Sequence, residues 1–263
     1  MSTGTSTGIK AGTADMTTTE QERPAPALEL VVARYREDLS WLRELGLPST
    51  VYNKGPELSP ELLPPETRLL VLPNLGREAH TFLTHIIRRY DALPEFTAFL
   101  QGDPFAHLAP PDGPRASPQA LRLRLLEMAA QNQPFAGLAW FRLRCDGLGR
   151  PHDLADPAKE GRWKGWGKNI PVARVFEELF GSPAPQEFIA RAPTGNMLVR
   201  RDRILARSRG FYQRALDLVL ADADDAENTG HALERLWQTV FSGAARGASS
   251  GRAHCASPSQ GGG

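Results

Sequence analysis

The chain has 263 residues, of which 41% are hydrophobic, so it can bury a real core in one domain of ordinary to large size. Its 31 Lys and Arg residues balance 30 Asp and Glu residues, which gives no reason to expect nucleic acid as a partner. No apolar run approaches the roughly 20 residues that a transmembrane helix needs. The two cysteines make neither a disulfide framework nor a metal cluster, so a cytoplasmic protein without a membrane span is expected.

Composition also separates a folded part from two tails. Residues 1–26 are rich in Thr, Ser and Gly near their start and lack the apolar segment of a secretory signal. Residues 242–263 are rich in Gly, Ser and Ala. Neither segment has enough apolar side chains to offset the entropy lost on ordering. We therefore expect one α/β domain at residues 27–241, with a disordered tail on each side.

The first half of this domain alternates strand and helix patterns. Short apolar runs predict strands at residues 29–34, 49–52, 68–72 and 96–100. Helical patterns occupy residues 38–45 and 78–90, and the second has a clear apolar face. Such alternation is typical of a mostly parallel sheet covered by helices on both faces, which is a three-layer, Rossmann-like α/β fold. The short early strands leave a mixed sheet open.

The second half is less regular. A helix is predicted at residues 118–131, and one strand at residues 135–144. A long loop follows at residues 147–171, because this segment is rich in Gly and contains two Trp. The remaining predicted elements are helices at 172–180, 202–220 and 231–241, and strands at 187–191 and 196–199.

Polar residues follow each of the first four predicted strands. They occupy residues 34–38, 53–55, 73–78 and 101–103. In open α/β sheets, ligands bind outside the carboxyl ends of the strands. The four polar segments should therefore converge on one ligand site.

Two cations and a helix start make an anion the expected ligand. Arg77 opens the best predicted helix, where backbone N–H groups attract anions. Its guanidinium could bind a phosphate through two parallel hydrogen bonds. Lys54 stands beside a turn glycine and could also bind phosphate. The alternatives are that Asn74 caps the helix while Glu78 complements its dipole, and that Asn53 and Lys54 form a solvated turn.

Other candidates lie around these cations. Tyr35 could stack on a base, whereas Arg34 could instead pair with nearby carboxylates. His80 could point toward the crevice from the first turn of the helix; it is five residues from His85, and this spacing does not suit a helical metal pair. Arg201 lies in a basic turn just before the helix predicted at residues 202–220 and could touch phosphate, although Asp202 as an N-cap explains part of this turn.

The motifs VVARYREDLSWL, VYNKG, LPNLGREAHTFLTHIIRRY and FLQGDPF resemble those of a family known as a domain of unknown function. The later segments APTGNMLVRRDRIL, GFYQRALDLV and HALERLWQTVF extend the resemblance in family order. It covers nearly all of residues 30–241. The family name supplies no activity.

More distantly, the layout is similar to that of GT-A type glycosyltransferases. Residues 101–103 occupy the place of their Asp-x-Asp motif, and residues 195–204 resemble a stretch that shapes the acceptor pocket. This resemblance implies that Asp103 holds a divalent cation, Mn²⁺ or Mg²⁺, and that Glu234 serves as a general base. The sequence departs from the motif at Gln101, which replaces the first acid and offers only a neutral oxygen. From the residues alone, Asp103 could equally cap a turn, and Glu234 could be an exposed helix charge.

Two hypotheses follow. The first is an enzyme that transfers a sugar from a nucleotide-diphosphate donor to a hydroxyl acceptor, with Asp103 and Glu234 as catalytic residues. The second is a non-catalytic module that binds a sugar or nucleotide on the same scaffold. The residues expected to contact the ligand are Arg34, Tyr35, Asn53, Lys54, Asn74, Arg77, Glu78, His80, Gln101 and Arg201.

Overall fold

The computed structural model describes Met1 and residues 27–110, 112–150 and 169–242. The two segments expected to be disordered tails lie outside the described residues, apart from their boundary residues Met1 and Ser242. Most of the loop expected at residues 147–171 also lies outside them.

In the described residues, six strands form one sheet in the order β3-β2-β1-β4-β8-β5. The first four strands in this order run parallel. β8 runs antiparallel to both of its neighbours. Listed in sheet order, the strands are β3 (Arg68–Val71), β2 (Ser49–Asn53), β1 (Leu28–Arg34), β4 (Phe96–Gln101), β8 (Met197–Arg200) and β5 (Phe135–Gly137).

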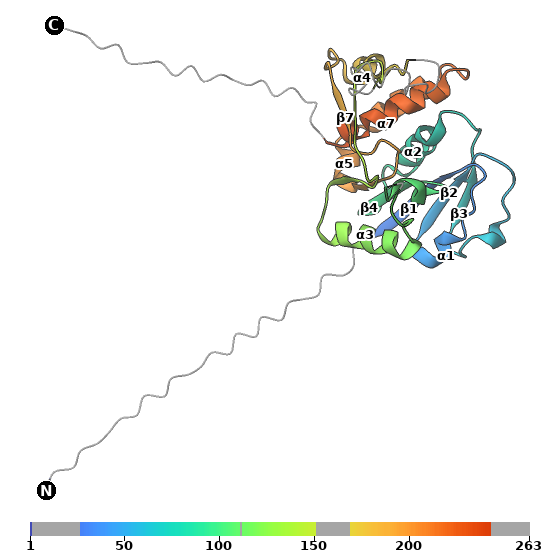
Figure 1. The fold of residues 1–263 in the computed structure, drawn as a ribbon, viewed down its shortest axis with the longest axis vertical. Helices are drawn as coiled ribbons and strands as arrows, with labels where there is room; N and C mark the ends of the chain where they lie inside the picture. The colour runs from blue at the N-terminus through green and yellow to red at the C-terminus, as the bar shows by residue number, and fades with distance from the viewer. Residues whose placement is uncertain (2–26, 111, 151–168, 243–263) are drawn as a thin grey trace.

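Helices cover both faces of this sheet, which confirms the three-layer α/β fold. Figure 1 shows α1 and α3 below the sheet and α2 and α7 above it. Alternate residues of β1 explain this arrangement, because Leu30 and Val32 pack with α1 and α3 while Val31 and Ala33 pack on the opposite side. The helices are α1 (Trp41–Leu45), α2 (Arg77–Arg89), α3 (Pro118–Ala130), α4 (Val172–Phe180), α5 (Arg201–Leu205), α6 (Arg209–Leu220) and α7 (Ala226–Ser242).

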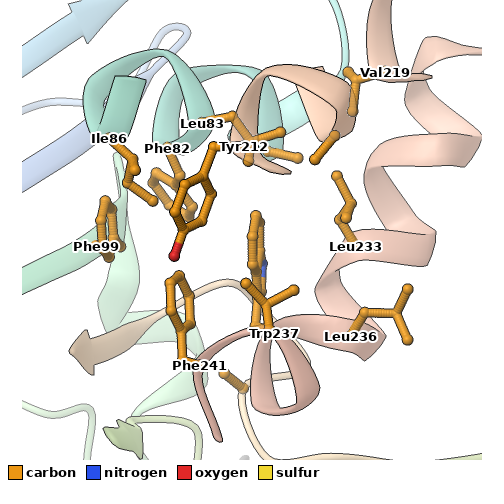
Figure 2. Close-up of a cluster of buried hydrophobic side chains, with 14 of the residues drawn as sticks. Phe82, Leu83, Ile86, Phe99, Tyr212, Val219, Leu233, Leu236, Trp237 and Phe241 are labelled. Atoms are coloured by element: carbon orange, nitrogen blue, oxygen red, sulfur yellow. The ribbon is translucent and has the colours of Figure 1, made fainter. Parts of the chain in front are cut away.

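The core between the sheet and α2, α6 and α7 is rich in aromatic rings. Figure 2 shows Trp237 at the centre of this cluster. Its ring centroid lies 5.7 Å from that of Phe241 and 6.2 Å from that of Phe82. Phe241 in turn stacks on Phe99 of β4 at 6.4 Å. Because α7 supplies both Trp237 and Phe241, this last helix closes the core formed by the first half of the chain.

The structure differs from the sequence prediction in the second half. The strand predicted at residues 135–144 is two strands, β5 and β6 (Leu143–Cys145), and β6 pairs with β7 (Phe188–Ala190) in a separate small sheet. The helix predicted at residues 202–220 is divided into α5 and α6, because the Ser208 side chain accepts from Phe211 N and starts a new helix. Two short 3-10 helices, η1 (Pro60–Leu62) and η2 (Pro104–His107), lie between the predicted strands and helices.

The strand order reverses its direction of winding near the centre of the sheet. From β1 the chain adds β2 and β3 on one side and then crosses to place β4 on the other side. The carboxyl ends of β1 and β4 therefore mark the point where the winding reverses, and ligands of open α/β sheets bind there. Because β8 is antiparallel, its first residue rather than its last lies at this edge.

Candidate functional site

A cavity of about 420 Å³ opens at the carboxyl ends of β1 and β2, and we call it the strand-end cavity. The turn after β1, the end of β2, the start of α2 and the segment before α7 all contribute to its wall. The residues that line it are Ala33, Arg34, Tyr35, Glu37, Lys54, Asn74, Leu75, Gly76, Arg77, Glu78, Ala223, Asp224 and Ala226. Six residues expected to contact the ligand are among these.

Lys54 ties β2 to the start of α2. Its buried Nζ donates to the carbonyl oxygen of Leu75 at 2.5 Å and to that of Arg77. Burial lowers the pKa of Lys54 to about 8, and the nearby Glu78 carboxyl opposes part of this change. The ammonium group is therefore largely charged at neutral pH, and it has a third N–H beyond these two bonds.

Arg34 and Asn53 hold the loops that form the opposite wall. Arg34 Nη1 donates to Asn53 Oδ1 at 2.7 Å and to the carbonyl oxygen of Pro56 at 3.0 Å. Arg34 Nε donates to the carbonyl oxygen of Glu37 at 3.0 Å. Tyr35 is 40% exposed at the rim. Arg34 thus organises the wall, whereas the exposed Tyr35 ring contacts the guanidinium of Arg36, which lies 4.9 Å from its centroid.

The start of α2 has an unusual backbone. Gly76, the N-cap, has a φ of 60°, and Arg77 also has a positive φ of 49°. A positive φ in a non-glycine residue is strained, and such strain is concentrated at functional sites. A Cβ at Gly76 would lie 2.1 Å from Val219 Cγ1 of α6, so only glycine fits here. Asn74 lines the cavity but does not cap the helix, which corrects the capping alternative.

Two carboxyl groups flank Arg77. Arg77 Nε lies 3.5 Å from Glu78 Oε2 and 3.5 Å from Glu234 Oε1. Burial raises the pKa of Glu78, and the charge of Glu234 raises it further, although Arg77 opposes both effects. Glu234 is buried rather than exposed, and its Oε2 lies 3.3 Å from His231 Nδ1. Glu78 belongs to the cavity lining, although its Oε2 is buried, whereas Glu234 of α7 is not part of the lining.

Gln101 positions Glu78. Its Nε2 donates to Glu78 Oε1 at 2.9 Å, and its Oε1 accepts from Asn196 Nδ2 at 3.2 Å. Asn196 Oδ1 also accepts from Gln101 N at 2.8 Å. Sequence reasoning missed Asn196, because the direction of β8 was not predicted. The APTGN segment before β8 was the available signal.

Asp103 lies in a neighbouring cavity of about 440 Å³, which we call the second cavity. Both of its oxygens accept from Arg115 Nη2, at 2.7 and 2.5 Å, and one of them also caps η2 through Phe105 N. The amide oxygen of Gln101 accepts from Asn196. Across the described residues, no three His, Cys, Asp or Glu side chains gather closely enough to hold a metal ion. In this structure Asp103 is thus paired with Arg115, and the Gln101 side chain bonds Glu78 and Asn196.

Glu37 connects the two cavities, since it lines both. Its Oε2 accepts from Tyr35 N at 2.6 Å and from Arg36 N at 3.0 Å. A Cβ at Gly102 would lie 2.5 Å from the same oxygen, so glycine allows β4 to end against Glu37. Glu37 lies in the polar segment that the sequence places after β1, but it was not among the residues expected to contact the ligand.

Two other expected residues do not line the strand-end cavity. His80 is buried beneath it, and burial, with a smaller effect of the Lys54 charge, lowers its pKa to about 4. Arg201 lies at the opposite edge of the sheet, where its backbone N donates to the carbonyl oxygen of Glu95 just before β4. It is there because β8 runs antiparallel to β4.

The sequence matches a family model described as "Protein of unknown function (DUF3431)" over residues 30–259. The chain belongs to the DUF3431 family. The match confirms the resemblance seen in the sequence motifs. Among curated proteins, no relative matches this DUF3431 protein. Its described helices include none that is long and apolar enough to cross a membrane.

Among solved structures, this DUF3431 protein is similar to a CMP:2-keto-3-deoxy-manno-octonic acid synthetase complexed with CTP. The two share 12% identity, and the alignment covers 81% of this chain and 86% of the synthetase chain, with a TM-score of 0.34. At this TM-score the two structures differ too much for the ligand of one to inform the other.

Proposed function

We propose that this DUF3431 protein binds a nucleoside diphosphate sugar in the strand-end cavity and transfers the sugar to a hydroxyl acceptor. One observation carries the proposal. Glu78, a carboxyl group with a raised pKa, lies in the same cavity as the Lys54 ammonium and the start of α2. An anion-binding end and a proton-accepting group then face one ligand at the reversal point of the sheet.

The donor would lie with its diphosphate against Lys54 and the first turn of α2. The third N–H of Lys54 and the positive end of the helix both favour negative charge. The exposed Tyr35 ring suits stacking on the base. Arg34 and Asn53 act indirectly, because their bonds hold the two loops of the wall in place.

In the transfer step, the acceptor oxygen forms a bond to the anomeric carbon of the sugar. The bond between that carbon and the diphosphate oxygen breaks, and the diphosphate leaves with the electron pair. The acceptor proton passes to Glu78, since a raised pKa makes a carboxylate a stronger proton acceptor. Lys54 and Arg77 stabilise the charge that develops on the leaving diphosphate. Glu234, expected as the base, would share this role by raising the pKa of Glu78 from behind Arg77.

A second candidate is a binding module without transfer activity. The contacts of Gln101 favour it, because the residue in place of the first acid of the motif holds Glu78 and Asn196 rather than a cation. Asp103 is likewise paired with Arg115. Asp103 as the ligand of a divalent cation stays a prediction of the enzyme hypothesis.

Glu78→Gln separates the two candidates. The variant keeps an oxygen for Gln101 but cannot accept a proton. For the enzyme, we expect nucleoside diphosphate sugars to raise the melting temperature of both proteins, while sugar release or transfer is lost in the variant only. Glu66→Gln, at an exposed position outside the cavity lining, is the matched control.

The same thermal-shift panel is measured with and without manganese. Stabilisation that requires manganese, and that Asp103→Asn removes, would support the cation. Binding without any donor turnover in the wild-type protein would favour the module. Absence of any shift with every nucleoside diphosphate would contradict both candidates.

A further inference from the structure

A groove of about 330 Å³ runs along the outer edge of the sheet at β5, and we call it the β5 groove. β5 is the last strand in the sheet order and pairs only with β8 in the described residues. The groove is distant in the sheet from the strand-end cavity, because β8 and β4 separate β5 from β1. It plays no part in the proposed transfer reaction.

The floor of this groove is an open strand edge. Leu138 N donates to the carbonyl oxygen of Asn196, and Arg200 N donates to that of Pro134. These bonds flank Ala136, which faces β8 opposite Leu198. In an antiparallel ladder the intervening residues point their N–H and C=O groups the other way. The backbone groups of Phe135 and Gly137 therefore point into the groove, where another strand could bind them.

The two walls leave room for a strand. Arg124 and Met128 of α3 line the groove from one face of the sheet, and Arg191 lines it from the other. A Cβ at Gly137 would lie only 1.7 Å from the carbonyl oxygen of Arg191. The glycine thus lets the Arg191 segment pack over one face of β5 while the in-plane edge stays open.

The charged side chains that line the groove are all positive. Arg124, Arg142 and Arg191 all line it, and among the described residues no Asp or Glu does. Arg124 Nη1 donates to the carbonyl oxygen of Leu138, whereas Arg142 and Arg191 are exposed. Trp140, 49% exposed, lies at one end of the groove. Charged side chains alone can protect a strand edge from aggregation. An acidic ligand could in addition pair with the arginines and form hydrogen bonds with the open backbone of β5.

We propose that the β5 groove binds an extended acidic peptide segment of a partner protein, which adds to the sheet as a seventh strand beside β5. Strand addition gives affinity through main-chain hydrogen bonds to Phe135 and Gly137, and the arginines select acidic side chains. The Trp140 ring offers an apolar contact at the end of the added strand.

The test uses fluorescence anisotropy with a labelled peptide of about five to eight residues that alternates Glu and Val, a length typical of single strands. Two further peptides carry N-methyl groups at alternate residues, one on each set of positions. A docked strand has one edge against β5, so one methylated peptide should lose at least about tenfold in affinity while the other binds as before. Equal binding of all three peptides would show simple charge attraction and would overturn strand addition.

Charge-reversal variants test the arginines on the full-length protein. Arg142→Glu and Arg191→Glu should each weaken peptide binding by at least about tenfold. Arg88→Glu, an exposed position on α2, is the matched control and should change little. Binding of single-stranded DNA as tight as that of the acidic peptide, or no peptide binding at low salt, would overturn the proposal.

Discussion

Burial acts in opposite directions on Lys54 and Glu78, which both line the strand-end cavity. It lowers the pKa of the Lys54 ammonium and raises the pKa of the Glu78 carboxyl. Each charged form loses hydration. The Glu78 charge restores part of that loss for Lys54, and the Arg77 charge does so for Glu78. Perturbed groups of this kind cluster where ligands bind.

The stability of the protein should depend on pH through Glu78. Because its folded pKa is raised, its favourable contribution is complete below the unfolded value of about 4.3 and is lost as the pH rises through the folded value. Glu78→Gln removes this loss and keeps the bond to Gln101. The variant should therefore gain free energy of unfolding relative to wild type as the pH rises from about 4 to 8. Urea unfolding at a series of pH values measures the difference, and a constant difference would contradict the pKa change.

Anion binding should depend on pH through Lys54. The affinity for a nucleoside diphosphate should fall as the pH rises through about 8, where the ammonium loses its proton. Since one proton is involved, the limiting slope is about tenfold per pH unit. Isothermal titration calorimetry measures the affinity between about pH 7 and pH 9.5, a range that spans the pKa of Lys54. Lys54→Arg, which stays charged, should flatten the profile; an unchanged profile would remove Lys54 from the site.

At the scale of single elements, the start of α2 decides the shape of the cavity. Gly76→Ala forces a side chain into a left-handed conformation and against Val219. We expect it to lower the free energy of unfolding by about 1–3 kcal/mol. Asn74→Ala should change it by less than about 0.5 kcal/mol, because Asn74 does not cap the helix. Urea unfolding compares the two, and an equal loss in both variants would show that Asn74 supports the helix after all.

The elements that the sequence predicts well are those with a local cause. The start and end of α2 are predicted within one residue, because its apolar side chains recur on one face and Pro94 follows soon after its end. The sequence does not predict that β5 and β6 are separate strands. The chain leaves the sheet after β5 because Trp140 N donates to the carbonyl oxygen of His107, a contact between distant parts of the chain. The same distinction between local and long-range causes applies to the candidate site. Residues that follow parallel strands come together, whereas Asn196 and Arg201 depend on the direction of β8, which is set by pairing with distant strands.

At the scale of the whole molecule, two hydrophobic clusters share one sheet. Trp237 belongs to the cluster on the α7 face and Leu125 to the cluster on the α3 face. Trp237→Ala should cost about 3–5 kcal/mol and Leu125→Ala about 2–5 kcal/mol. If residues 27–241 form one domain as expected, both variants should shift a single cooperative transition. Calorimetry, together with unfolding curves from two spectroscopic probes, measures the number of transitions. Two separate transitions would contradict a single domain.

The position of β8 also determines when the molecule can be completed during synthesis. β8 lies between β4 and β5, yet Asn196 follows Gln101 by 95 residues in the chain. At a translation rate of about 5–20 residues per second, β4 waits roughly 5–20 seconds for its neighbour. During that time one edge of β4 is unpaired and Phe99 lacks the rings of α7 that later cover it. The nascent chain thus carries an exposed strand edge until its last third emerges, and this stage of biogenesis is where a chaperone would be needed most.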